Sequence, residues 1–156
     1  MDNAAEQSLW FLAILPPADV ADRVRAVQQE IADRLNKTGT LHVTIDVEEG
    51  LPRLSKEQEI HLFRILQELI NNTLKYAKAT EFQVQLSHDE THCIVMAEDN
   101  GKGFDPGQLK TAPGNGWYNI HSRLKLIDGT VEVDSRPDAG TVVTLEVPLQ
   151  KSELVA

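Results

Sequence analysis

The feature that most constrains the fold is a long amphipathic segment at residues 56–78. Ser55 and Gln58 form the pattern of a capping box, which predicts that a helix begins at Lys56. The segment then carries apolar residues at helical spacing on one broad arc: Leu62, Phe63, Ile65, Leu66, Leu69, Ile70, Leu74 and Ala77. A helix with one wide apolar face packs against another layer of structure, so a layered domain is expected.

Other segments favour strands around this helix. Apolar and polar residues alternate at 41–47 and 82–86, and two further strands are predicted at 130–134 and 141–147. Residues 93–97 form a continuous apolar run, which predicts a central strand covered on both faces. Helices are predicted at 20–35, ended by Gly39, and at 117–127. The order predicts an α+β sandwich, with one sheet and helices on one of its faces.

Composition excludes several classes of function. The length of 156 residues suits one domain. Twenty-four acidic against fifteen basic residues give a net charge of −9, which argues against nucleic acid as a partner. The lone cysteine, Cys93, excludes an internal disulfide and indicates a reducing compartment, so a cytoplasmic location is expected. The longest apolar run, residues 9–15, is too short to span a membrane.

Polar side chains gather at one border of the long helix. At about 100° per residue, Glu68, Asn72 and Lys75 fall close together, with Tyr76 between them and the apolar arc. Polar helix borders are common, but asparagine is a poor helix former, so a helix usually carries one for a reason or tolerates it on the surface. The group offers a carboxylate, an amide, an ammonium and a phenol at the rim of a buried face.

A glycine-rich stretch follows the strand at 93–97. Asp99 stands at its carboxyl end, and Gly101 and Gly103 allow the backbone to turn sharply and approach a ligand. Gly114 and Gly116 precede the helix at 117–127, where backbone N–H groups could hold a phosphate. Each pattern alone is also typical of an ordinary turn. Long loops of this kind in compact domains are usually functional.

Taken in order, these motifs resemble the GHKL ATPase superfamily, and most closely the catalytic domain of sensor histidine kinases that pair with LuxR/NarL-type response regulators. Residues 68–77 (ELINNTLKYA) look like the N box, 98–105 (EDNGKGFD) like the G1 box and 114–123 (GNGWYNIHSR) like the G2 box. Residues 140–148 (GTVVTLEVP) resemble the closing strand. The resemblance covers roughly residues 20–150 and implies the family's two-layer sandwich, with a mixed, mostly antiparallel sheet.

The resemblance implies cofactors, ATP and Mg²⁺, and roles at the phosphate end of the nucleotide. Asn72 would ligate Mg²⁺, Lys75 would contact phosphate, and Glu68 would orient water or the metal's surroundings or act as a base. This agrees with the habit of Mg²⁺ to bind few protein ligands together with substrate phosphates. Gly114 and Gly116 would present their backbone to the phosphates from the far end of an ATP lid.

The resemblance also implies roles at the base end. Asp99 would accept a hydrogen bond from the adenine amino group, with Thr141 assisting through water, and Tyr76 would contact the nucleoside. Gly101 and Gly103 would hinge the lid. Nucleotide binding of this kind positions the γ-phosphate for transfer, which needs placement and charge neutralisation more than covalent chemistry.

No histidine lies in the helical context that such kinases phosphorylate; the five are His42, His61, His88, His92 and His121. The chain is therefore expected to be the catalytic half of a protein histidine kinase, acting on a histidine-bearing dimerisation domain and, indirectly, on a response regulator. Residues 1–19 would be a linker from that domain, 20–150 the ATP-binding domain and 151–156 a tail. The isolated domain is expected to be a monomer and the full kinase a homodimer, and whether the parent protein is anchored to a membrane stays open.

Two alternatives share the fold and stay open: an anti-sigma-factor or switch kinase that acts on serine, and a nucleotide-dependent protein-binding module. The Asn72, Asp99, Gly101 and Gly103 set argues against a degenerate module. A two-histidine phosphoesterase is excluded because its chemistry needs two facing His-x-Thr/Ser motifs, and only His42 begins one.

Overall fold

In the computed structural model, the described residues are 41–52, 54–108 and 116–149. The helix predicted at 20–35, its end at Gly39, the segment 1–19, the tail 151–156 and Gly114 lie outside them. Within the described residues, no helix combines the length and the apolar character needed to cross a membrane.

The sheet has five strands, in the order β1-β2-β3-β5-β4. Its strands are β1 (His42–Val47), β2 (Glu81–His88), β3 (His92–Asp99), β4 (Thr130–Ser135) and β5 (Thr141–Pro148). Only the β1–β2 pair among these strands is parallel, and the β2–β3, β3–β5 and β4–β5 pairs are antiparallel. The predicted mixed, mostly antiparallel sheet is confirmed, and β3 is its central strand.

The long helix begins as predicted. Helix α3 (Lys56–Asn72) opens on a complete capping box, in which the Gln58 N–H donates to Ser55 Oγ (3.1 Å) and the Ser55 N–H donates to Gln58 Oε1 (3.0 Å). Its last turn differs from the expectation, because residues Thr73–Ala77 form a π-helix (η1). Lys78 then ends the helix with a left-handed φ of 50°. A short 3-10 turn, η2 (Pro106–Gln108), and helix α4 (Trp117–Leu126) follow later in the chain.

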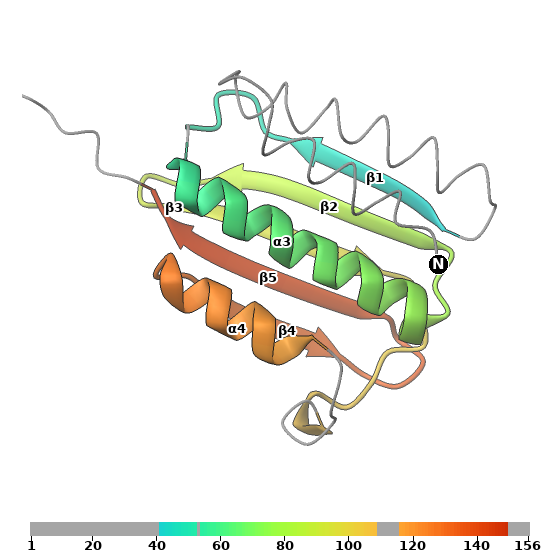
Figure 1. Cartoon of the computed structure of the whole chain (residues 1–156). Helices are drawn as coiled ribbons and strands as arrows, with labels where there is room; N and C mark the ends of the chain where they lie inside the picture. Colours follow the sequence, from blue (N-terminus) through green and yellow to red (C-terminus); the bar gives the residue numbers. More distant parts are fainter. Residues whose placement is uncertain (1–40, 53, 109–115, 150–156) are drawn as a thin grey trace, which may run out of the picture.

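Helices α3 and α4 lie side by side on one face of the sheet, as Figure 1 shows. Alternate strand residues point into the space between the layers because successive side chains of a strand face opposite sides. The core therefore combines the inward positions of the strands with the apolar faces of both helices, among them Val43, Val84, Val95, Leu145, Val147, Ile65, Ile70 and Ile120.

The prediction that β3 is covered on both faces is wrong for the residues that the structure describes. Burial alternates along β3, with Cys93, Val95 and Ala97 buried and Met96 37 % exposed. The strand's neighbours are antiparallel, and an antiparallel sheet can leave one face to solvent. Ile94 and Met96 lie on that outer face, and so the unbroken apolar run does not report two-sided burial.

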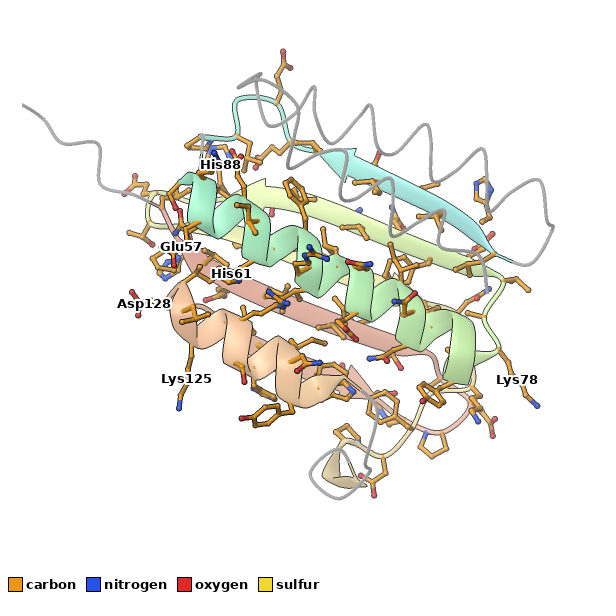
Figure 2. The ribbon with its side chains drawn as sticks, in the orientation of Figure 1. Glu57, His61, Lys78, His88, Lys125 and Asp128 are labelled. Atoms are coloured by element: carbon orange, nitrogen blue, oxygen red, sulfur yellow. The ribbon has the colours of Figure 1, made fainter. Side chains whose placement is uncertain are left out.

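The topology brings four chain segments to one end of the domain. The carboxyl ends of α3 and β3 lie there, together with the amino ends of α4 and β5 (Figure 1). Figure 2 labels Lys78 at this end, whereas Glu57, His88 and Asp128 lie at the opposite end. The predicted site residues that the structure describes come from these segments and the turns beside them.

Candidate functional site

One half of the site joins the ends of α3 and α4. Glu68 and Asn72 stand four residues apart on α3, which places them on one helix face. Gly116, with a φ of 75°, precedes α4 and lies so close to them that a Cβ there would collide with the Glu68 carboxylate and stand 3.8 Å from Asn72 Oδ1. Glycine is therefore required at 116 by both backbone conformation and space. The structure thus brings the predicted site residues Glu68, Asn72 and Gly116 together.

The Asn72 side chain is incompletely satisfied. Its Nδ2 atom is buried and finds no hydrogen-bond partner among the described residues. Buried polar atoms are nearly always hydrogen-bonded, and an unsatisfied one costs free energy. Because an amide also offers an oxygen that suits Mg²⁺, the Asn72 side chain fits a place beside a metal ion and a phosphate.

The other half of the site lies at the end of the sheet. Asp99, 9 % exposed, is the last residue of β3 and stands opposite Thr141, 7 % exposed, the first residue of β5. Asp99 Oδ1 accepts a hydrogen bond from the Gly101 N–H (2.8 Å). Burial raises the pKa of the Asp99 carboxyl, against the lowering effect of the Gly101 bond, and Glu98 raises it further. A buried carboxylate and a hydroxyl-bearing side chain thus stand opposite each other where β3 ends and β5 begins.

The turn after β3 packs against the π-helix. The Lys102 N–H donates to the Ala77 carbonyl (2.7 Å), and a Cβ on Gly101 would collide with that carbonyl oxygen. Gly103 likewise has no room for a Cβ, which would meet the Arg136 carbonyl. These contacts hold the two halves of the site together, because η1 directly continues the helix that carries Glu68 and Asn72. Single π-turns inside helices are frequent at functional sites.

The remaining predicted residues are less fully described. Tyr76 lies on η1 and is 50 % exposed. The side chain of Lys75 and all of Gly114 lie outside the described residues.

Two polar residues of the site were not predicted from the sequence. Asn100 Oδ1 accepts from the Thr80 and Glu81 N–H groups (2.9 and 3.0 Å), which fastens the start of β2 to the turn after β3. Ser135, at the end of β4, lies 2.8 Å from the Thr141 hydroxyl. Hairpin pairing was the signal that could have identified Ser135. When the predicted strand at 130–134 is extended by one residue, Ser135 pairs with Thr141.

Comparisons with known proteins agree with this architecture. The chain is 34 % identical over 116 residues to the oxygen sensor histidine kinase NreB of Staphylococcus carnosus, covering 74 % of this chain and 33 % of that protein. It is 37 % identical over 119 residues to the sensor protein VraS of Staphylococcus saprophyticus, covering 76 % of this chain and 33 % of that protein. The chain thus spans about a third of the length of these relatives.

Solved structures share the fold. A histidine kinase domain from the Erythrobacter litoralis blue-light activated kinase EL346 aligns over 93 % of this chain and 71 % of that one, with a TM-score of 0.69 at 20 % identity. The Acinetobacter baumannii histidine kinase AdeS aligns over 94 % and 76 %, with a TM-score of 0.68 at 18 % identity.

The decisive comparison is at the level of the family. Residues 57–151 match the family described as histidine kinase-, DNA gyrase B-, and HSP90-like ATPases. That span begins at the start of α3 and ends just beyond β5, so it includes both halves of the site. An ATPase domain binds ATP, and this chain belongs to the histidine kinase-, DNA gyrase B- and HSP90-like ATPase family.

Proposed function

We propose that this chain is the ATP-binding catalytic domain of a two-component sensor histidine kinase. In this account it binds Mg²⁺-ATP and transfers the γ-phosphoryl group to a histidine on a separate dimerisation domain. The observation that carries the proposal is the meeting of two different groups at one end of the domain. Glu68, Asn72 and Gly116 form one, and Asp99 with Thr141 forms the other.

The sheet end of the site suits the adenine base. Asp99 is an acceptor beside the Thr141 hydroxyl, and a buried carboxylate forms strong hydrogen bonds with an amino group. We assign Asp99 to the adenine amino group, with Thr141 assisting through a water molecule. The half-exposed ring of Tyr76 is available to the nucleoside at the rim.

The helix end of the site suits the phosphates. Asn72 supplies an amide oxygen for Mg²⁺, and its unsatisfied Nδ2 leaves a donor for a phosphate oxygen. Backbone N–H groups at Gly116, at the amino end of α4, favour an anion because of the helix dipole. On the strength of the family resemblance, we also assign Lys75 and the backbone of Gly114 to the phosphates. When bound, Mg²⁺ neutralises the charge of the phosphates during transfer.

Glu68 is assigned a positioning or base role. Its carboxylate lies against Gly116 and shares a helix face with Asn72, so it can orient water near the phosphates. In the transfer, the bond from the γ-phosphorus to ADP breaks as a bond to the imidazole nitrogen forms. Accurate placement of these partners supplies most of the rate enhancement in such reactions.

The phosphoacceptor is assigned to another domain. Three of the five histidines are engaged in contacts away from the site: His61 with Arg123 (3.4 Å), His88 with Glu48 (2.9 Å) and His92 with Thr91 (2.7 Å). Figure 2 labels His61 and His88 at the opposite end of the domain from Lys78. A response regulator of the LuxR/NarL type is the proposed next acceptor of the phosphoryl group.

Transfer of a labelled γ-phosphoryl group tests the proposal. The chain is incubated with Mg²⁺-ATP labelled at the γ-phosphate, alone and with the histidine-bearing dimerisation domain of its own kinase. We expect acid-labile, base-stable label on the added domain and none on this chain. Acid-stable label on serine of a partner protein would favour the switch-kinase alternative. Acid-labile label on the chain alone would show that one of its own histidines is the acceptor.

A further inference from the structure

Ser135 forms a small buried network beside the proposed base site. Its side chain is 6 % exposed and stands at the end of β4, opposite Thr141. Ser135 Oγ accepts from the Phe104 N–H (2.9 Å), donates to the Gly140 carbonyl (3.0 Å) and lies 2.8 Å from Thr141 Oγ1. One hydroxyl therefore links β4, the start of β5 and the segment that follows the turn after β3.

The direction of the Ser135–Thr141 bond follows from counting protons. A serine hydroxyl has one proton and two lone pairs. Ser135 uses its proton on the Gly140 carbonyl and one lone pair on the Phe104 N–H. The remaining lone pair fits a proton that Thr141 donates, and this arrangement satisfies Ser135 completely. The reverse direction would withdraw the donor from the Gly140 carbonyl.

This direction has a consequence for the ligand. When the Thr141 proton points at Ser135, Thr141 Oγ1 presents only lone pairs to its other neighbours. Asp99 stands opposite Thr141 across the β3–β5 pair and is also an acceptor when ionised. Asp99 as an acceptor favours a ligand edge with a donor at position 6, and a water that donates one proton to Thr141 keeps its other proton for an acceptor such as adenine N1. Inosine presents the opposite pattern, with a carbonyl oxygen at position 6 and an N1–H beside it.

We infer that Ser135 is a positioning residue that holds the Thr141 hydroxyl as an acceptor and thereby sets the preference for a 6-amino over a 6-oxo purine nucleotide. The inference rests on the proposed function, since it assigns the base to the Asp99–Thr141 spot. Ser135 acts through Thr141 and does not itself touch the base.

The test compares ATP with inosine triphosphate, which carries a carbonyl oxygen where adenine carries its amino group. Affinities of both nucleotides for the full chain are measured by titration calorimetry. In Ser135→Ala the Thr141 hydroxyl is free to rotate and to donate to the bridging water, which can then accept from the inosine N1–H. We expect the ATP-to-inosine-triphosphate affinity ratio to fall about three- to tenfold, the size of one neutral hydrogen bond.

A double-mutant cycle separates positioning from general loosening. In a Thr141→Val background, adding Ser135→Ala should leave the ratio unchanged, because the hydroxyl that it controls is gone. Ser55→Ala is the matched control: it removes a hydroxyl that caps α3 at the helix end away from Asn72, and should lower stability without moving the ratio. If Ser135→Ala does not fold, Ser135→Cys replaces it, since a thiol fills the volume but bonds weakly.

The outcomes distinguish this inference from the proposed function. If the unmodified chain binds neither nucleotide, the proposed function fails and this inference fails with it. If the unmodified chain prefers ATP but Ser135→Ala lowers the affinity for both nucleotides equally, the affinity ratio is unchanged. The positioning role of Ser135 is then wrong, while the proposed function stands. A further fall of the ratio in the Thr141→Val background would equally overturn the role, because Ser135 would then act by another route.

Discussion

In the proposed site, stability and nucleotide binding place opposing demands on Asp99. Burial raises its pKa, so the folded chain holds an ionised carboxylate in a place that disfavours charge. A group with a raised pKa in the folded state stabilises the fold at low pH and loses that contribution as pH rises through the folded pKa. At neutral pH the carboxylate therefore costs the empty fold stability, which fits the proposed role of Asp99 in binding adenine.

Asp99→Asn should accordingly raise the free energy of unfolding at pH 7 in the absence of nucleotide. An amide carries no charge to desolvate, and its oxygen can still accept from the Gly101 N–H. The gain over the unmodified chain should shrink as pH falls through the raised pKa toward 3.8, where Asp99 becomes protonated too. Urea unfolding at several pH values measures this, and a variant less stable than the unmodified chain at pH 7 would contradict it.

Asn72 offers a second prediction at the scale of one side chain. Asn72→Ala should remove most of the increase in ATP affinity that Mg²⁺ provides, because the amide oxygen that would ligate the metal is lost. Asn71→Ala is the matched control, since it removes the same group from the neighbouring position of α3. Calorimetric titrations of ATP with and without Mg²⁺ measure the Mg²⁺ enhancement in both variants and in the unmodified chain. Equal Mg²⁺ enhancement in Asn72→Ala and the unmodified chain would exclude Asn72 as a ligand.

At the scale of elements, the contact between η1 and the turn after β3 unites the two halves of the site. Gly101 lies directly on the Ala77 carbonyl, which also accepts from the Lys102 N–H. The contact is between backbones, so no flexible side chain can move aside to make room. The position of Asp99 relative to Asn72 therefore depends on a glycine at 101.

Gly101→Ala should lower the free energy of unfolding by about 1–3 kcal/mol, as is typical of overpacking, and weaken ATP binding as well. Gly107→Ala is the matched control because Gly107 is exposed and its nearest neighbour is the flexible Asp105 side chain, so a change within about 0.5 kcal/mol is expected. Chemical unfolding and ATP titration of both variants check this. Equal stability of the two variants would contradict the account.

The same elements show which features local sequence determines. The start of α3 was predictable because a capping box involves residues only three apart, and Asp99 at a strand end follows from the apolar run before it. The π-turn at Thr73–Ala77 and the role of Ser135 were not, because both depend on contacts with distant segments. The prediction that β3 is buried on both faces was wrong for a related reason: an apolar residue such as Met96 does not reveal whether a second layer covers it.

At the scale of the whole molecule, the proposed nucleotide site and the histidine contacts lie at opposite ends of the domain. The site residues lie where α3, β3, α4 and β5 meet, and the contacts of His61 and His88 lie at the other end (Figure 2). The chain spans about a third of the length of relatives such as NreB and VraS. The proposal assigns the acceptor histidine to a separate domain. Every step of that proposal depends on ATP bound at the Asp99 end.

The central claim is tested most directly by calorimetric titration of Mg²⁺-ATP into two variants that lose the same charge at adjacent positions. Glu98 and Asp99 are neighbours on β3, but Glu98 is exposed on the outer face whereas Asp99 is buried beside Thr141. Asp99→Asn should weaken ATP binding roughly ten- to hundredfold, the size of one charge-assisted hydrogen bond. Glu98→Gln should bind ATP like the unmodified chain. Unchanged affinity in Asp99→Asn, or an equal loss in both variants, would contradict the assignment of the site.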